Sequence, residues 1–116
     1  MTYGEYVRKA RECLREQDKS YSLRQVARRI GVEPAYLSKI ERGDMAPPSE
    51  ATTRKLADEL GEDADLLLAM SGKVSSDLQE IIRKHPKLFA ELLRELRDAP
   101  EHAILRIMRE VRDGDW

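Results

Sequence analysis

Three donors of different kinds lie within little more than one helical turn: those of Ser38, Lys39 and Arg42. A lysine ammonium can donate to guanine O6 or N7, a serine hydroxyl can bind a base edge, and an arginine guanidinium binds phosphate oxygens. Projected at about 100° per residue, the three side chains share one side of a helix with Ala35. This small, polar and basic side is suited to binding a nucleic acid.

The other side of this helix is apolar, and a second helix is predicted just before it. Leu37 and Ile40 form the apolar side. Residues 23–30 are expected to be helical because apolar residues recur there at i, i+3, i+4 and i+7. Gly31 can take a positive φ in the turn, and Pro34 loses no N–H at a first helical position. Such a pair matches a helix-turn-helix, whose second helix enters the DNA major groove, although adjacent amphipathic helices also occur in many other α-helical domains.

Particular residues favour the helix-turn-helix over another pair of adjacent amphipathic helices. The features are a small Ala27 where the two helices cross, Gly31 in the turn, the run from Tyr36 to Gly43, and Pro47 to Ser49 before the next helix. With them, residues 4–68 resemble the Cro and phage-repressor type of helix-turn-helix, often called the XRE family. The resemblance implies an all-α fold with a five-helix, repressor-like DNA-binding domain.

The resemblance also implies how the two helices meet double-stranded DNA. In that family the start of the first helix of the pair lies against the DNA backbone, where its N–H groups and dipole favour an anion. We expect phosphates to be contacted by the start of this helix, by the arginines of both helices and by Tyr36. Other residues of the second helix are expected to read bases. The expected DNA-binding residues are Ser22, Arg24, Gln25, Arg28, Ala35, Tyr36, Ser38, Lys39 and Arg42.

The start of the second helix departs from the family pattern. Glu33 stands at the N-cap, where Ser or Thr is common, and it either accepts from cytosine N4 or points aside as a poor cap, which we favour. Pro34 and Ala35 occupy positions that in relatives often carry base-reading amides, and they offer only apolar contact, for instance to a thymine methyl. Lys39 is therefore the leading candidate for direct base reading, and Ser38 is the second.

The first helix is predicted from Thr2 to Gln17. Thr2 is a possible N-cap with Glu5 three residues later, which is a capping-box arrangement. The resemblance implies that Arg11 and Glu41 pair and so join this helix to the DNA-reading helix. Cys13 is interpreted as a small core residue. The expected inner stripe consists of Tyr6, Ala10, Cys13 and Leu14.

Further capping residues complete a domain expected to occupy residues 1–70. Ser22 with Gln25 predicts a second capping box at the start of the helix-turn-helix. Ser49 is expected to cap a fourth helix, and Asp63 a short fifth one.

Residues 71–116 are predicted to form a helical extension. Ser76 with Gln79 suggests another capping box, and Pro86 and Pro100 each open a further amphipathic helix. Three such helices have too little interior to be stable alone. They either pack against the first domain or bury their apolar stripes against a second copy. We favour a homodimer, because a single helix-turn-helix reads few base pairs and usually pairs on a two-fold site.

The charge distribution is mildly asymmetric. The chain of 116 residues has a net charge of −1. Residues 1–61 contain 12 Lys and Arg against 10 Asp and Glu, whereas residues 62–116 contain 9 against 12. The sign is the one expected of an N-terminal DNA-binding half, but local placement of the basic residues must provide most of the attraction.

Other function classes find little support. No apolar run approaches the roughly 20 residues that cross a bilayer, and no signal-peptide pattern is present, so we expect no membrane contact and a cytoplasmic location. Cys13 cannot form an internal disulfide. His85 and His102 belong to no metal-ligand pattern and are expected at the surface or at helix caps. No nucleophile motif or Gly-rich phosphate loop stands out, so neither an enzyme nor a cofactor nor a metal is expected.

These observations favour a sequence-specific transcription regulator, in the simplest case a repressor that binds an inverted-repeat operator as a homodimer. One alternative is a protein-interaction adaptor, for which Glu33, Pro34 and Ala35 speak. Another is an antitoxin or phage-type repressor whose C-terminal helices bind a protein partner.

Overall fold

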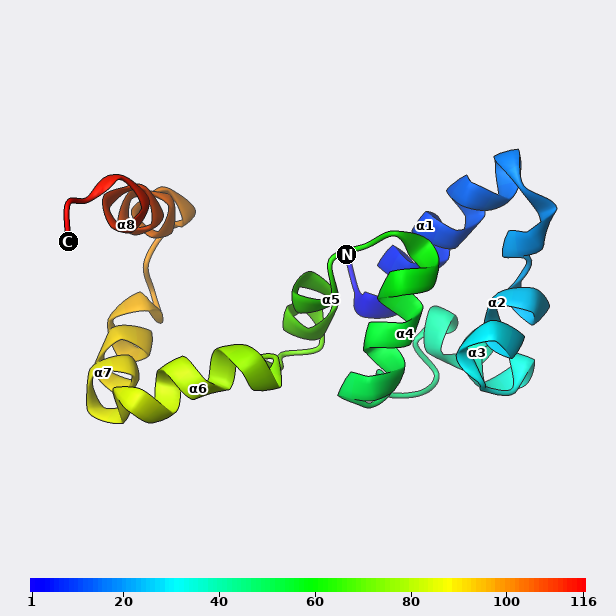
Figure 1. Ribbon diagram of the computed structural model, residues 1–116, viewed down its shortest axis with the longest axis horizontal. Coiled ribbons are helices and arrows are strands. Elements are labelled where there is room, and N and C mark those ends of the chain that lie inside the picture. The colour runs from blue at the N-terminus through cyan, green and yellow to red at the C-terminus, as the bar shows by residue number, and fades with distance from the viewer. The chain divides into compact units, whose positions relative to one another are not determined.

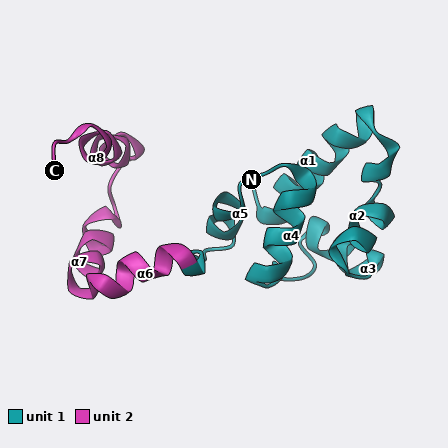
Figure 2. Cartoon of the chain, viewed as in Figure 1, with its two compact units in different colours: residues 1–76 teal, residues 77–116 magenta.

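The chain forms only helices, turns and loops, so the predicted all-α class is confirmed (Figure 1). A computed structural model describes all 116 residues, which divide into two compact units, residues 1–76 and 77–116 (Figure 2). The first unit contains α1 (Tyr3–Gln17), the short 3₁₀ helix η1 (Lys19–Tyr21), α2 (Leu23–Ile30), α3 (Pro34–Arg42), α4 (Glu50–Leu60) and α5 (Ala64–Met70). The later helices are α6 (Ser76–Lys84), α7 (Pro86–Leu96) and α8 (Glu101–Asp113).

Helix starts in the first unit follow the predicted caps. The Thr2 hydroxyl accepts from the backbone N–H of Glu5, and the Glu5 carboxylate accepts from the backbone N–H of Thr2, so the capping box is present. Each predicted cap of α2, α4 and α5 accepts a hydrogen bond from a backbone N–H of its own first turn. These caps are Ser22, Ser49 and Asp63. Gly31 ends α2 with a φ of +79°, which L side chains rarely adopt.

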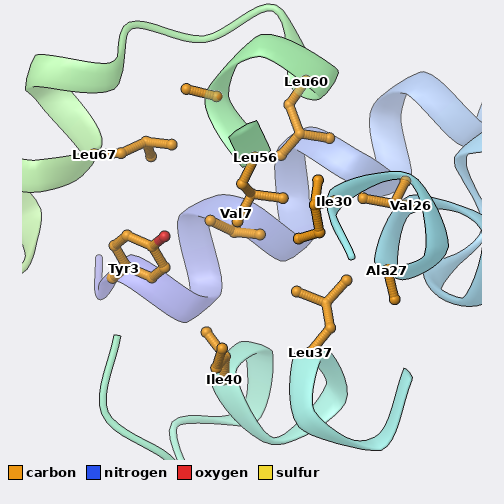
Figure 3. Packing of buried hydrophobic residues seen from close by; sticks show 11 residues of the cluster. Tyr3, Val7, Val26, Ala27, Ile30, Leu37, Ile40, Leu56, Leu60 and Leu67 are labelled. Atoms are coloured by element: carbon orange, nitrogen blue, oxygen red, sulfur yellow. The ribbon is translucent and has the colours of Figure 1, made fainter. Parts of the chain in front are cut away.

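The apolar faces of α1 to α5 meet in a single core (Figure 3). Figure 3 shows Leu37 of α3 and Leu56 of α4 pointing into the interior that Val7 of α1 also enters. The Tyr3 hydroxyl shares a 3.0 Å hydrogen bond with Thr53 in this interior, and burial raises the pKa of Tyr3. Because Val7, Leu37 and Leu56 are wholly buried, each contributes about 1.5–3 kcal/mol of hydrophobic free energy. The apolar stripes predicted for α2 and α3 are thus confirmed.

The predicted inner stripe of α1 is confirmed at Tyr6, Ala10 and Leu14, which are partly buried and pack against the core, but not at Cys13. Cys13 is exposed, and the expectation that it is a core residue is wrong. The most buried positions are Tyr3, Val7 and Arg11. Cys13 follows the buried Arg11 by two residues, which at about 100° per residue places it on nearly the opposite side of the helix from that arginine.

Gly4 allows α1 to touch the backbone of α3. A Cβ atom at this position would overlap the carbonyl oxygen of Ile40 and would lie 2.8 Å from that of Glu41. Gly4 is helical and buried, so its role is close approach and not a positive φ.

Ser76, the last residue of the first unit, does not act as the predicted cap. α6 begins at Ser76 itself, so the prediction that Ser76 caps this helix is wrong. Its backbone N–H and its hydroxyl instead donate to the two carboxylate oxygens of Glu50, at 2.9 and 2.8 Å. These bonds lower the pKa of Glu50. Ser76 is thereby joined to the first turn of α4 within the first unit.

The second unit consists of the predicted helices but lacks a core. Pro86 stands at the first position of α7, and Pro100 is the N-cap of α8. No residue of α6, α7 or α8 is buried.

Candidate nucleic-acid interface

The exposed side of α3 carries the side chains predicted to meet DNA. Its buried side is formed by Leu37, Ile40 and Glu41. Ala35 and Lys39 lie on the opposite side and are exposed. Because the Lys39 side chain forms no hydrogen bond or ion pair within the protein, its ammonium group is free to bind a ligand.

Arg24 and Arg28 lie one turn apart on α2 and are both exposed. Together with Val32, Glu33 and Pro34 they line a shallow hollow at the start of α3. Neither guanidinium has a partner within the protein. Glu33 forms no side-chain cap bond, as expected of a poor cap, so this hollow combines two uncommitted cations with one carboxylate.

Arg42 forms a weak, exposed ion pair within the protein. It pairs with Asp44 at 3.3 Å, and the two side chains are 55% and 61% exposed. Such a solvated pair contributes little free energy, so a phosphate can replace Asp44 at small cost.

Two predicted residues, Ser22 and Gln25, are tied into the turn before α2. The Ser22 hydroxyl accepts from the backbone N–H of Gln25 at 3.3 Å. When the Gln25 amide is oriented so that its nitrogen faces hydrogen-bond acceptors, this nitrogen donates to the carbonyl oxygens of Lys19 and Ser20 at 2.9 and 3.1 Å. The predicted reciprocal bond of a capping box is not made at this helix. What this helix start offers an anion is therefore chiefly its backbone N–H groups.

Tyr36 and Ser38 lie at the two edges of the exposed side of α3. Tyr36 is half-buried and packs against the core, so only part of its ring is accessible. Ser38 lines a small hollow that also includes Arg8 and Arg42. The sequence reasoning did not identify Arg8, since a basic residue on α1 looks like part of a solvated face. The signal was weak because nothing local shows that α1 passes beside Ser38.

A buried ion pair positions α3 against α1. Arg11 Nε and Nη2 donate to the two oxygens of Glu41 at 2.8 and 2.9 Å, and Nη1 donates to the carbonyl oxygen of Tyr21 at 3.2 Å. The hydrogen bonds that Arg11 donates to Glu41 raise the pKa of Arg11 above its usual value. Pairing of Arg11 with Glu41, which the resemblance implied, is confirmed.

A second pair positions α2 against α4. Arg29 donates to Glu59 at 2.6 Å and to the carbonyl oxygen of Ser20 at 2.8 Å, and its guanidinium lies 5.2 Å from the centre of the Tyr21 ring. The Arg29 guanidinium is thus bound within the protein, whereas that of the neighbouring Arg28 is not. Sequence alone did not separate these adjacent arginines.

Nothing in the chain gathers groups for metal chemistry: no cluster of three or more His, Cys, Asp and Glu residues could hold an ion. Both His85 and His102 are exposed, and the cap position of His85 makes no side-chain bond. None of the helices has the length and apolar character needed to span a membrane.

The geometry defines a helix-turn-helix DNA-binding protein, in which α2 supports α3 and α3 exposes a small, basic side. Comparison with protein families matches residues 8–67, more than half of the chain, to the helix-turn-helix family of the Cro and phage-repressor (XRE) type. The chain belongs to this family, which is one of DNA-binding transcription regulators and not of enzymes. Comparison with curated proteins and with solved structures gave no match.

Proposed function

We propose that this regulator is a repressor that occupies an inverted-repeat operator as a homodimer. The observation that carries the proposal is the set of uncommitted cations on α2 and α3. The side chains of Arg24, Arg28 and Lys39 are all exposed, and none forms a hydrogen bond or ion pair within the protein. The opposite sides of the same helices are buried in the core. A surface kept free of internal ion pairs is what a polyanion requires.

In this proposal most contacts neutralise phosphates. Arg24 and Arg28 bind the backbone beside the start of α3, and Arg42 does so after leaving Asp44. Tyr36 adds a hydroxyl from the edge of α3. Each phosphate neutralised contributes about 0.9 to the slope of log K against log salt concentration, so affinity falls steeply with salt.

Base reading is assigned to the exposed side of α3. Lys39 donates to guanine O6 or N7, and Ser38 offers a second hydrogen bond. Ala35, exposed near the start of the helix, packs against a thymine methyl. Ser22 and Gln25 act at the backbone through the start of α2, which they stabilise.

The test begins with selection of bound sequences from a random duplex pool, followed by binding at several salt concentrations. An inverted repeat should be enriched. Lys39→Ala should weaken discrimination at one base pair in each half-site by about 1–3 kcal/mol, whereas Arg28→Ala should weaken all sequences alike and reduce the salt slope by about 1. Lys55→Ala, which removes an exposed lysine from α4, is the matched control and should change neither quantity. A uniform loss with Lys39→Ala would remove this residue from base reading.

A second candidate is an adaptor or antitoxin that binds a protein partner. It is favoured by the start of α3, where Pro34 and Ala35 offer no side-chain hydrogen bonds and Glu33 adds a carboxylate. Weak DNA binding without sequence enrichment or salt dependence would support this candidate against the repressor.

A further inference from the structure

A small hollow beside the exposed side of α3 is lined by side chains from three helices. Arg8 of α1 and Arg42 of α3 line it together, and so does Leu23, the first residue of α2. Ser38, which is assigned to base reading, lines it as well. Its volume of about 150 Å³ equals that of roughly five molecules of liquid water, so a phosphodiester group has room to enter.

The buried wall of this hollow carries no unpaired charge. Arg11 and Glu41 belong to it, and they are joined by two hydrogen bonds of 2.8 and 2.9 Å. Both side chains are almost wholly buried. Because Arg11 neutralises Glu41, this carboxylate does not repel an anion, and the charge that an anion meets is set by Arg8, Arg42 and Glu12.

The two outer arginines are bound only by exposed carboxylates. Arg8 donates through Nε to Glu12 at 3.1 Å, and the two side chains are 56% and 51% exposed. The pair of Arg42 with Asp44 is equally solvated. Exposed pairs of this kind contribute little free energy, and the terminal nitrogens of a guanidinium remain available to bind phosphate oxygens. Both cations can therefore bind an anion in this hollow at small cost.

We propose that a backbone phosphate of duplex DNA binds in this hollow, between Arg8 and Arg42. α1 then contacts DNA together with α2 and α3, and Arg8 is a phosphate-binding residue outside the helix-turn-helix. Since Ser38 lines the same hollow, the phosphate lies directly beside the base-reading side of α3, where cations from two helices fix the position of α3 on the DNA backbone. The inference rests on the proposed function, because it adds one contact to the same DNA-binding surface.

The test measures binding of the full chain to the selected operator and to a duplex of random sequence at several salt concentrations. Arg8→Ala should reduce the slope of log K against log salt concentration by about 1 on both duplexes, since one phosphate is no longer neutralised. The ratio of wild-type to variant affinity should then grow about 3- to 4-fold as salt falls from about 0.2 M to about 0.05 M. Arg8→Lys, which keeps the charge, should retain most of the slope.

Removal of the competing carboxylate should have the opposite effect. Glu12→Gln leaves Arg8 unpaired and should raise the affinity for both duplexes about 2- to 5-fold, which a purely structural role of the ion pair would not do. Two charge-matched controls lie on the same helix. Lys9→Ala removes an exposed cation that lines a different hollow, with Leu60, and Glu16→Gln removes an exposed carboxylate one turn beyond Glu12. Neither control should change the affinity by more than about 1.5-fold, because salt screens distant charges.

The outcomes separate this inference from the proposed function. An unchanged slope with Arg8→Ala overturns the phosphate site, and so does an equal loss with Lys9→Ala, since the effect would then be one of net charge. If no operator is enriched while Arg8→Ala still lowers the slope on the random duplex, the repressor function falls and the phosphate site stands. If an operator is enriched and Arg8→Ala binds it like the wild type, the phosphate site falls alone. A chain that binds no duplex overturns both.

Discussion

Arg11→Met should remove one half of the buried ion pair that joins α1 to α3. The substitution deletes two hydrogen bonds to Glu41 and one to the carbonyl of Tyr21, and it leaves the Glu41 carboxylate facing an apolar chain. The two side chains are only 5% and 3% exposed, so water cannot replace the lost bonds. An unpaired buried charge of this kind costs about 3–5 kcal/mol, a large part of the 5–15 kcal/mol that typically stabilises a domain.

Urea denaturation followed by circular dichroism measures this loss. The matched control is Arg8→Met, which breaks the ion pair with Glu12 one turn earlier on α1, where both side chains are about half exposed. That variant should lose no more than about 0.5 kcal/mol. The double variant Arg11→Met with Glu41→Leu should recover most of the stability, because it removes both charges and leaves apolar groups in their place.

Two results would refute the reasoning about Arg11. The first is a similarly small loss for Arg11→Met and Arg8→Met, since burial would then not matter. The second concerns the double variant. If its loss of unfolding free energy equals or exceeds the sum of the losses of Arg11→Met and Glu41→Leu measured singly, the two charges do not depend on one another.

Three further predictions concern local contacts. Gly4→Ala should destabilise the protein by about 1–3 kcal/mol in urea denaturation despite alanine's better helix propensity, because its Cβ meets the backbone of α3; an unchanged midpoint would contradict the close approach. Ser22→Ala should cost about 1 kcal/mol through loss of the α2 cap, and equal stability would show that the cap is dispensable. The bonds from Ser76 lower the pKa of Glu50, so their stabilisation is complete above its ordinary value of 4.5 and is lost as pH falls through the lowered value. Glu50→Gln should therefore flatten the acid side of the stability profile, and an unaltered slope would argue against this role.

The sequence was most informative where the structure depends on near neighbours. A cap such as Thr2 and a turn glycine such as Gly31 act within a few residues, so their types predict the helix ends. The inner faces of α2 and α3 follow from spacing alone. Pairing of Arg11 with Glu41 became predictable only through the family resemblance, because no local pattern links residues 30 positions apart.

The missed features depend on where other elements lie. Cys13 has the spacing of a core residue, but the buried face of α1 is centred on Tyr3 and Val7 and reaches Arg11, so Cys13 lies outside it and is exposed. Gly4 looks like a poor helix former until the crossing backbone of α3 is known. Ser76 has the type of a cap, yet Glu50 of another helix binds it. For the candidate DNA-binding residues, the sequence indicated which helices carry them, but not that the Arg28 guanidinium is unpaired while Arg29 pairs with Glu59.

The contacts that hold α3 in place are concentrated on one side and near its C-terminal end. Leu37 anchors it in the core, and Ile40 and Glu41 carry the backbone contact with Gly4 and the pair with Arg11. The exposed positions 35 and 39 share none of these contacts. Under the proposed function, base reading and folding therefore depend on different residues: exchange of the side chains at 35 and 39 should alter which duplex is preferred while changing stability by no more than about 0.5 kcal/mol. If that function holds, new target sequences require no change in the interior of this domain.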